Sequence, residues 1–172
     1  CWELTNVGSN NVALSKQQLN FVDTKLKIKS EFANSFGDLS IWGIIFYVYG
    51  ESARKGLLKY VLECVLNGSE IKLNKPNMCV DYIHVTDVAQ AIIELCSHGG
   101  SSQVQLGTGI GYTVKEFVKK TLEIARPGEN DLSVIFPEES PAETLVADTR
   151  TVSNMQWFRS KLGLSDGLSS CI

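Results

Sequence analysis

Three polar side chains, Asp81, Tyr82 and His84, lie where a short apolar strand is expected to run directly into an amphipathic helix. A carboxylate, a phenol and an imidazole at one corner could bind a ligand or move a proton. They could equally hydrogen-bond the corner itself, because buried polar groups require partners. We interpret the three mainly as residues that shape this corner, and His84 as a hydrogen-bonded structural histidine.

Lys16 is a second candidate. It lies in ALSKQQ at 13–18, which resembles the catalytic helix of a known enzyme family in which a tyrosine precedes the lysine by four residues and so shares one face of the helix with it. The resemblance implies that the lysine ammonium lowers the pKa of the phenol from about 10, so that the phenolate can take a proton near neutral pH. The position of the tyrosine is Val12 in this chain. Valine can neither donate nor accept a proton. The alternative interpretation of Lys16 is an ordinary surface lysine.

The segment 107–111, Gly-Thr-Gly-Ile-Gly, joins an expected strand to an expected helix, as a phosphate-binding loop does. The dinucleotide fingerprint G-x-G-x-x-G needs its third glycine where this chain has Tyr112. We therefore predict a tight turn at 107–111, and reject it as a cofactor loop.

A mixed series of helices and strands must position these residues. An apolar pattern of helical period runs from Val12 to Phe36, and the continuous apolar run from Leu39 to Tyr49 is typical of a strand buried on both faces of a parallel sheet. Thr113 and Glu116 have capping-box spacing, which predicts a helix up to about Ala125. Further helices are expected at 56–66, 85–96 and from 148 toward 157, and strands at 70–73, 104–106, 132–136 and 145–147. This order predicts an α/β fold with mostly parallel crossovers.

Composition narrows the class of protein. At 172 residues the chain can form one buried core, alone or with a small satellite domain. A net charge of −3 with scattered lysines and arginines provides no basic stripe for nucleic acid. The longest apolar run, Ile41–Val48, is too short for the roughly 20 residues of a membrane span. No secretory signal is present, so we expect a cytoplasmic protein, and the start at Cys1 suggests a fragment or a processed product.

The cysteines and histidines do not predict a metal site. The 5 cysteines are widely spaced without a CxxC pair, and neither of the 2 histidines lies at ligand spacing from them. Reduced thiols are the simplest interpretation.

Five segments together resemble one known family. The sequence VDYIHVTDVAQAI at 80–92 resembles the RD(F/Y)IHVxDVAxA signature of nucleotide-sugar epimerases and dehydratases, in the extended branch of the short-chain dehydrogenase/reductase superfamily. ALSKQQ at 13–18 resembles the helix that carries the YxxxK catalytic pair, and GIIFYVYG at 43–50 resembles the strand RxFNVYG. The segments 107–116 and 141–149 are similar to two later stretches, and their order agrees from about Val12 to Leu168.

The resemblance implies a Rossmann-like, doubly wound parallel sheet, of which only the C-terminal part is present, with a small α/β substrate-binding domain. Residues 1–50 would be the remnant of the dinucleotide-binding domain, with the YxxxK-type helix and the strand after it. Residues 51–172 would be mainly the nucleotide-sugar-binding portion, interleaved with the sheet. The GxxGxxG half of such an enzyme is missing from this sequence.

The resemblance also assigns roles to individual residues. Val12 occupies the position of the catalytic tyrosine, while Ile44 and Val80 stand where relatives carry arginines, the second of which clamps the diphosphate. Lys16 is the remaining catalytic residue. The implied cofactor-binding residues are Lys16, Phe46 and Tyr47, and the implied substrate-binding residues are Tyr47, Tyr49, Val80 and Asp81.

The function implied is that of an NAD(P)-dependent epimerase, dehydratase or reductase acting on a nucleotide-linked hexose. Its cofactor would be NAD or NADP, its ligand a nucleotide-diphosphate sugar, and a homodimer is one assembly that the family forms. Because Val12 replaces the tyrosine, we expect this chain alone to be inactive and a poor binder of the cofactor. The alternative is a non-catalytic, degenerate or truncated relative that acts as a binding or interaction domain.

Overall fold

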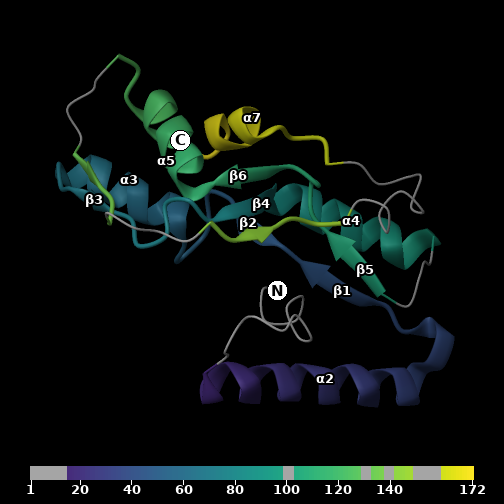
Figure 1. Cartoon of the computed structure of the whole chain (residues 1–172). Coiled ribbons are helices and arrows are strands. Elements are labelled where there is room, and N and C mark those ends of the chain that lie inside the picture. Colours follow the sequence, from purple (N-terminus) through teal and green to yellow (C-terminus); the bar gives the residue numbers. More distant parts are fainter. Residues whose placement is uncertain (1–14, 99–102, 129–132, 138–141, 149–159) are drawn as a thin grey trace.

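The computed structural model describes residues 15–98, 103–128, 133–137, 142–148 and 160–172, and within them helices alternate with short strands (Figure 1). The helices are α2 (Lys16–Phe36), the short 3-10 helix η1 (Gly37–Leu39), α3 (Leu57–Asn67), α4 (Val85–His98), α5 (Val114–Ala125) and α7 (Leu164–Ser169). The strands are β1 (Trp42–Ile45), β2 (Tyr47–Tyr49), β3 (Ile71–Lys72), β4 (Cys79–His84), β5 (Gln103–Leu106), β6 (Gly111–Thr113), β7 (Val134–Ile135) and β8 (Thr144–Leu145). The predicted α/β class is therefore confirmed.

Among the described strands, β4 pairs with the largest number of others. It pairs in parallel with β2, where Tyr47 lies opposite Tyr82, and in parallel with β8, where Leu145 lies opposite Val80. It pairs in antiparallel fashion with β6, where Gly111 lies opposite Asp81. The other two pairs, β1 with β5 and β3 with β7, are parallel, as the crossover pattern predicts.

The prediction of one continuous strand over Leu39–Tyr49 is wrong. The segment forms two strands with different partners: β1 pairs with β5, and β2 pairs with β4. The change of partner occurs at Phe46, whose backbone N–H donates to the carbonyl of Leu106 at 3.1 Å. Burial on both faces is also absent, since Tyr47 and Val48 are exposed.

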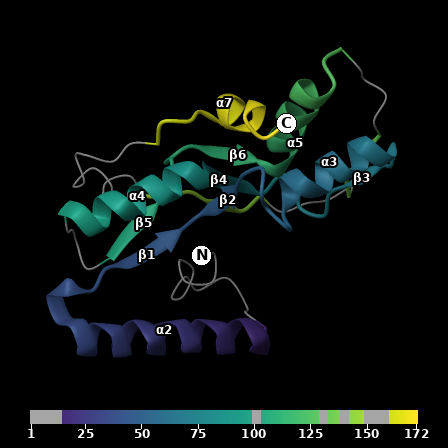
Figure 2. The same ribbon diagram turned by 180° about the vertical axis from the view of Figure 1, so that it is seen from behind.

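Helix α2 begins at Lys16, later than the helical pattern predicts. Ser15 has an extended backbone, with φ −65° and ψ 159°, and its hydroxyl accepts the N–H of Gln18 in a capping box. The helix that carries Lys16 begins at that residue, and Val12 lies outside the described residues. Both views show α2 apart from the strands (Figures 1 and 2). Its exposed apolar side chains are Leu19, Phe21, Leu26, Ile28, Phe32 and Phe36.

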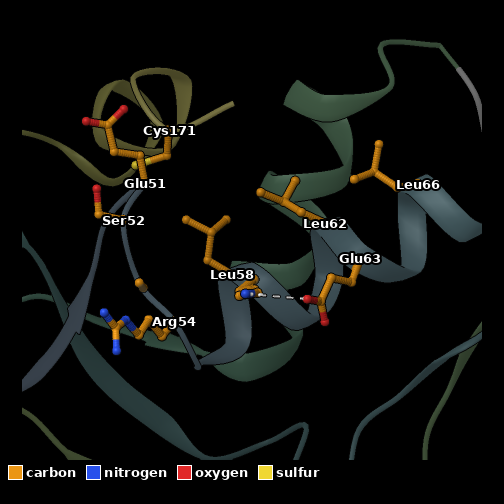
Figure 3. Close-up of a pocket in the computed structure, with 11 residues that line it drawn as sticks. Glu51, Ser52, Arg54, Leu58, Leu62, Glu63, Leu66 and Cys171 are labelled. Carbon is orange, nitrogen blue, oxygen red and sulfur yellow. Dashed lines mark ion pairs between the residues drawn. The ribbon is translucent and has the colours of Figure 1, made fainter.

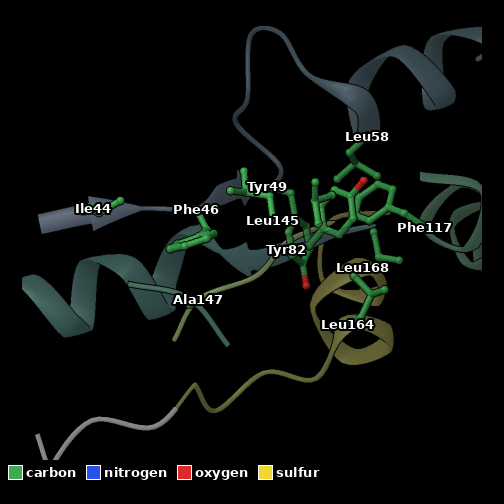
Figure 4. Close-up of a cluster of buried hydrophobic side chains, with 11 residues drawn as sticks. Ile44, Phe46, Tyr49, Leu58, Tyr82, Phe117, Leu145, Ala147, Leu164 and Leu168 are labelled. Atoms are coloured by element: carbon green, nitrogen blue, oxygen red, sulfur yellow. The ribbon is translucent and has the colours of Figure 1, made fainter. Parts of the chain in front are cut away.

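The capping box predicted at Thr113 and Glu116 is confirmed and starts α5. On the apolar face of this helix Phe117 and Val118 are buried, and α5 packs beside α3. Two of the three apolar clusters found among the described residues meet at α5. One joins α3, α5 and β3, and another joins β2, β4 and α7 (Figure 4).

The third apolar cluster lies between α4 and the β1–β5 pair. Ile83, Ala91 and Val104 are fully buried in it. Helix α4 therefore covers this pair of strands. Its buried face is formed by Val88, Ala91 and Leu95, whereas Val85, Ile92 and Ile93, which the sequence pattern placed on the buried stripe, are exposed.

The sequence analysis missed α7. This helix contributes buried Leu164 and Leu168 to the cluster around β4. The helix expected from Asp148 toward Trp157 lies almost wholly outside the described residues. Among the helices that are described, none is both long and apolar enough to cross a membrane.

Candidate functional site

Asp81 lies at the centre of the β4 corner, and its side chain is fully buried. Its Oδ1 accepts hydrogen bonds from the backbone N–H of Thr108 at 2.8 Å and from the Thr108 hydroxyl at 2.7 Å. Its Oδ2 accepts the N–H groups of Gly109 at 2.8 Å and Ala147 at 3.2 Å. One carboxylate thus joins β4 to two segments that are distant in sequence.

The glycines of the turn 107–111 allow this close approach. A Cβ on Gly107 would lie 2.6 Å from Asp81 Oδ2, and Gly109 has φ +77°, a conformation that favours glycine. The turn presents its N–H groups to an anion, as a phosphate loop does, but the anion is the carboxylate of Asp81. The prediction of a tight turn is confirmed.

An aromatic cluster continues from this corner. Tyr82 stacks on Phe117 with ring centroids 4.2 Å apart, and Tyr49 meets Phe117 edge-on at 5.7 Å (Figure 4). Burial raises the pKa of both Tyr49 and Tyr82 far above the ordinary value of a phenol, and neighbouring ionisable groups raise it further. Both phenols therefore stay protonated near neutral pH and cannot act as phenolate bases.

His84 ends β4 and is hydrogen-bonded, as the sequence analysis expects. Its Nδ1 lies 2.7 Å from the hydroxyl of Thr86 and 3.3 Å from the backbone N–H of Thr86, and its Nε2 lies 3.4 Å from the sulfur of Cys171. Asp87, in the first turn of α4, accepts the Ser160 hydroxyl at 2.7 Å and the Leu162 N–H at 3.2 Å.

The structure brings together only some of the residues to which the resemblance assigns roles. Tyr47 and Tyr49 lie on β2 opposite Tyr82 and His84 of β4. Val80 and Asp81 lie earlier in the same strand β4, where they are opposite β6. Lys16 is exposed at the start of α2, and in both views α2 lies apart from β2 and β4 (Figures 1 and 2). Among these residues, Tyr47 is exposed, while Phe46, Tyr49, Val80 and Asp81 are buried. Their binding roles stay predictions.

The two positions where relatives carry arginines are apolar and buried here. Ile44 is 7% exposed and Val80 is 1% exposed, and both belong to the cluster around β4. Neither position can offer a cation to a diphosphate.

A pocket of about 440 Å³ lies between the loop after β2 and helix α3 (Figure 3). Its lining residues are Gly50, Glu51, Ser52, Ala53, Arg54, Leu58, Lys59, Leu62, Glu63, Leu66 and Cys171. The cofactor and substrate residues predicted from the resemblance are not among them. No group of three or more metal-ligating side chains occurs within the described ranges.

The described residues do not by themselves fit a dinucleotide. NAD(P) is held by a glycine-rich turn whose N–H groups point at the pyrophosphate. G-x-G occurs only at 107–111 in this sequence, and the N–H groups of Thr108 and Gly109 are already bound to Asp81. A phosphate there would have to displace a buried carboxylate.

Two contacts at this corner had no local signal in the sequence. Thr108 follows a recognisable glycine turn, yet its partner Asp81 lies 27 residues away. Cys171 lies 87 residues from His84, and only the packing of α7 brings them together.

Comparison with known proteins gives a match in fold. No protein-family profile and no curated protein sequence matches the chain. The UDP-glucose 4-epimerase of Thermus thermophilus, solved with NAD, superposes with a TM-score of 0.71 at 20% identity, over 94% of this chain and 57% of its own. The dTDP-glucose 4,6-dehydratase of Bacillus anthracis, solved with NAD, superposes with a TM-score of 0.73 at 15% identity, over 93% of this chain and 51% of its own.

A third solved structure binds both a sugar nucleotide and the cofactor. The UDP-glucuronic acid 4-epimerase of Bacillus cereus, in complex with UDP-glucuronic acid and NAD, superposes with a TM-score of 0.73 at 14% identity, over 94% of this chain and 55% of its own. The chain thus spans little more than half the length of these proteins. It has the fold of that part of the NAD-dependent nucleotide-sugar epimerases and dehydratases of the extended short-chain dehydrogenase/reductase branch, as the sequence resemblance predicts.

Proposed function

We propose that this chain is the nucleotide-sugar-binding portion of an NAD(P)-dependent epimerase, dehydratase or reductase, and that the dinucleotide site comes from residues outside this sequence. The observation that carries the proposal is the superposition of more than nine-tenths of the chain on about half of three such enzymes. The turn at 107–111, already filled by Asp81, agrees with a cofactor site located elsewhere.

The proposed substrate-binding surface lies along β2 and its junction with β4. Tyr47 is 42% exposed there and packs edge-on against Tyr82, with ring centroids 6.1 Å apart. An aromatic ring that is half open to solvent and supported from behind suits a base or a sugar face. We place the whole protein in the cytoplasm and expect it to form a homodimer in which α2 takes part.

A second candidate function rests on the buried positions of Ile44 and Val80. Losing one charged contact to a diphosphate weakens binding by roughly 1.5–3 kcal/mol, which is about tenfold to a hundredfold. A chain with this loss, and with valine at position 12, suits an interaction domain that no longer binds substrate strongly.

Thermal unfolding with UDP-glucose and with dTDP-glucose tests the proposal. A ligand at a hundredfold excess over its Kd stabilises the folded state by about 2.7 kcal/mol and raises the Tm of a chain of this size by roughly 5–10 °C. We expect one of the two sugar nucleotides to do so, and neither free glucose nor NAD alone to shift the Tm.

Matched tyrosine variants locate the ligand. Tyr47→Ala, which removes the ring, should reduce the Tm shift, whereas Tyr60→Ala should not, because Tyr60 lies away from β2, where its phenol accepts the N–H of Lys72. Absence of a shift with both sugar nucleotides up to millimolar concentration would favour the interaction domain.

A further inference from the structure

The contact between Cys171 and His84 is set by tertiary packing. Helix α7 places Leu164 and Leu168 in the apolar cluster around β4. Cys171, two residues after the end of the helix, then lies beside the end of that strand. Gly167 faces the ring of Tyr49 so closely that no side chain would fit there. The sulfur of Cys171 then lies 3.4 Å from Nε2 of His84.

The hydrogen bonds of His84 determine which ring nitrogen carries the proton. His84 immediately precedes α4, and its Nδ1 accepts the backbone N–H of Thr86 at 3.3 Å, in the manner of a helix cap. A backbone N–H has a fixed direction, so Nδ1 is the acceptor and the neutral ring carries its hydrogen on Nε2. That hydrogen points at the sulfur of Cys171, whose own proton is directed to the carbonyl of Gly167 at 3.1 Å.

This arrangement prepares the sulfur for reaction. The thiolate is the reactive form of cysteine, and an N–H donor directed at the sulfur stabilises its negative charge. The ring of His84 is held in place, because it is 6% exposed and packs edge-on against Tyr49 with centroids 5.2 Å apart. A nucleophile oriented by a second group, which is itself oriented by a third, is the general pattern of activated side chains.

Cys171 also opens on the pocket of about 440 Å³, within the size range of small-molecule sites. Figure 3 shows it on the same side as Glu51 and Ser52, across from the leucines of α3. Glu51 and Arg54 are exposed at this pocket, so a carboxylate and a guanidinium are both available to a ligand that carries both charges.

We propose that Cys171 is a site of reversible thiol–disulfide exchange with zwitterionic low-molecular-weight disulfides, and that His84 is its positioning residue. The Cys171 thiolate attacks one sulfur of the disulfide. A bond forms between Sγ and that sulfur, the original S–S bond breaks, and the departing thiolate takes up the proton that Cys171 released. The disulfide is the oxidant, and the half of it that stays on Cys171 occupies the pocket.

The test uses oxidised glutathione as the probe and Cys96 as the internal comparison, because Cys96 is exposed on α4. Mass spectrometry of tryptic peptides gives the rate of mixed-disulfide formation at each cysteine. We expect the ratio of the Cys171 rate to the Cys96 rate to fall roughly tenfold in His84→Gln, the loss expected for one hydrogen bond to a charged group.

Two further arms keep the test decisive if His84→Gln does not fold. In urea, the two cysteines of the unmodified chain should react at similar rates. Arg54→Ala should slow the reaction of Cys171 with oxidised glutathione, but not with the uncharged 2-hydroxyethyl disulfide. A rate ratio that is unchanged by urea, or a folded chain in which Cys96 reacts while Cys171 does not, overturns the proposal.

Discussion

At the scale of single residues, the most consequential side chain is Asp81. Its carboxylate occupies the position that a ligand anion has in a phosphate loop, and four hydrogen bonds from three residues satisfy it. A glycine-rich turn can therefore be a structural element that binds the protein's own carboxylate.

The substitution Asp81→Asn should destabilise the folded state by roughly 3 kcal/mol, because hydrogen bonds to a charged group are replaced and a buried N–H is left without an acceptor. The new amide nitrogen would face either Thr108 or the N–H donors of Gly109 and Ala147. Urea unfolding followed by circular dichroism measures the difference.

Asp23→Asn is the matched control for this prediction, since Asp23 is exposed on α2. It should change the free energy of unfolding by less than about 0.5 kcal/mol. Equal effects of the two substitutions would show that the carboxylate of Asp81 contributes no more than a surface charge.

The sequence predicts the residues of this corner better than it predicts their partners. Asp81 and His84 are recognisable because they interrupt an apolar strand just before a helix. Their partners Ala147 and Cys171 lie 66 and 87 residues further along the chain. No local pattern encodes such a contact, because it depends on how β8 and α7 pack.

At the scale of elements, two helices begin with a capping box, and one of them is mostly exposed while the other packs in the core. Ser15 and Gln18 start α2, which exposes most of its apolar side chains. Thr113 and Glu116 start α5, which buries Phe117 in the core. The same local motif should therefore contribute differently to global stability.

Thr113→Ala should lower the free energy of unfolding by about 1 kcal/mol, the usual contribution of an N-cap hydroxyl. Ser15→Ala should lower the helix content of α2 with little effect on the cooperative unfolding transition, since α2 lies apart from the strands. Thermal denaturation gives the first quantity and far-ultraviolet circular dichroism the second. Similar losses of global stability would show that α2 unfolds together with the core.

The pH dependence of the free energy of unfolding should show the contribution of the Glu116 carboxylate. Hydrogen bonds from the backbone N–H and then the hydroxyl of Thr113 lower the pKa of Glu116 below its ordinary value. The pKa of Glu116 is lower in the folded state than in the unfolded state. The stabilisation that its carboxylate gives the folded state is therefore complete above the unfolded pKa of about 4.3, and it is lost as the pH falls through the folded pKa.

The stability difference between the wild type and Glu116→Gln should therefore stay constant from neutral pH to about 5 and shrink below about 4. Urea unfolding at a series of pH values measures it. Glu123→Gln is the control, because Glu123 lies in the same helix and only pairs with Lys119 at 3.7 Å on the surface.

Element bounds that depend on local signals were predicted best. The helical periods of α3, α4 and α5 lie within the helices themselves, and the bounds of these helices agree with the prediction to within two residues, as do those of β3, β5, β7 and β8. The division of 39–49 into β1 and β2 depends on Leu106 and on β4, which lie far along the chain. Residues 41–49 are all apolar or aromatic, so composition could not reveal the change of partner.

At the scale of the whole molecule, α2 stands apart from a core built around β4. The hydrogen bond from Lys29 Nζ to Gln103 Oε1 connects it to β5. Its exposed Phe32 and Phe36, with ring centroids 4.7 Å apart, form part of an apolar surface of the kind that usually meets another chain or domain.

Trypsin should therefore cut α2 at Lys25 or Lys27 before it cuts α5 at Lys119 or Lys120, since cleavage within a helix requires local opening. If opening of α5 costs at least about 1.4 kcal/mol more, cleavage there is roughly tenfold slower. Mass spectrometry of a time course identifies the sites. Equal protection of both helices at high concentration, lost on dilution, would indicate that a second copy covers α2.

The connections of β4 also determine when this chain can fold during synthesis. Its partners β2, β6 and β8 span residues 47–145, and the cluster around it is completed by Leu164 and Leu168. Contacts between distant residues form slowly, because the intervening chain must be ordered first. A ribosome that has released β4 still holds the residues that pair with its far edge. The nascent chain must therefore carry an unpaired edge of β4 until Leu145 has left the exit tunnel, and an incomplete apolar cluster until Leu168 has left it, which makes it a natural client for chaperones.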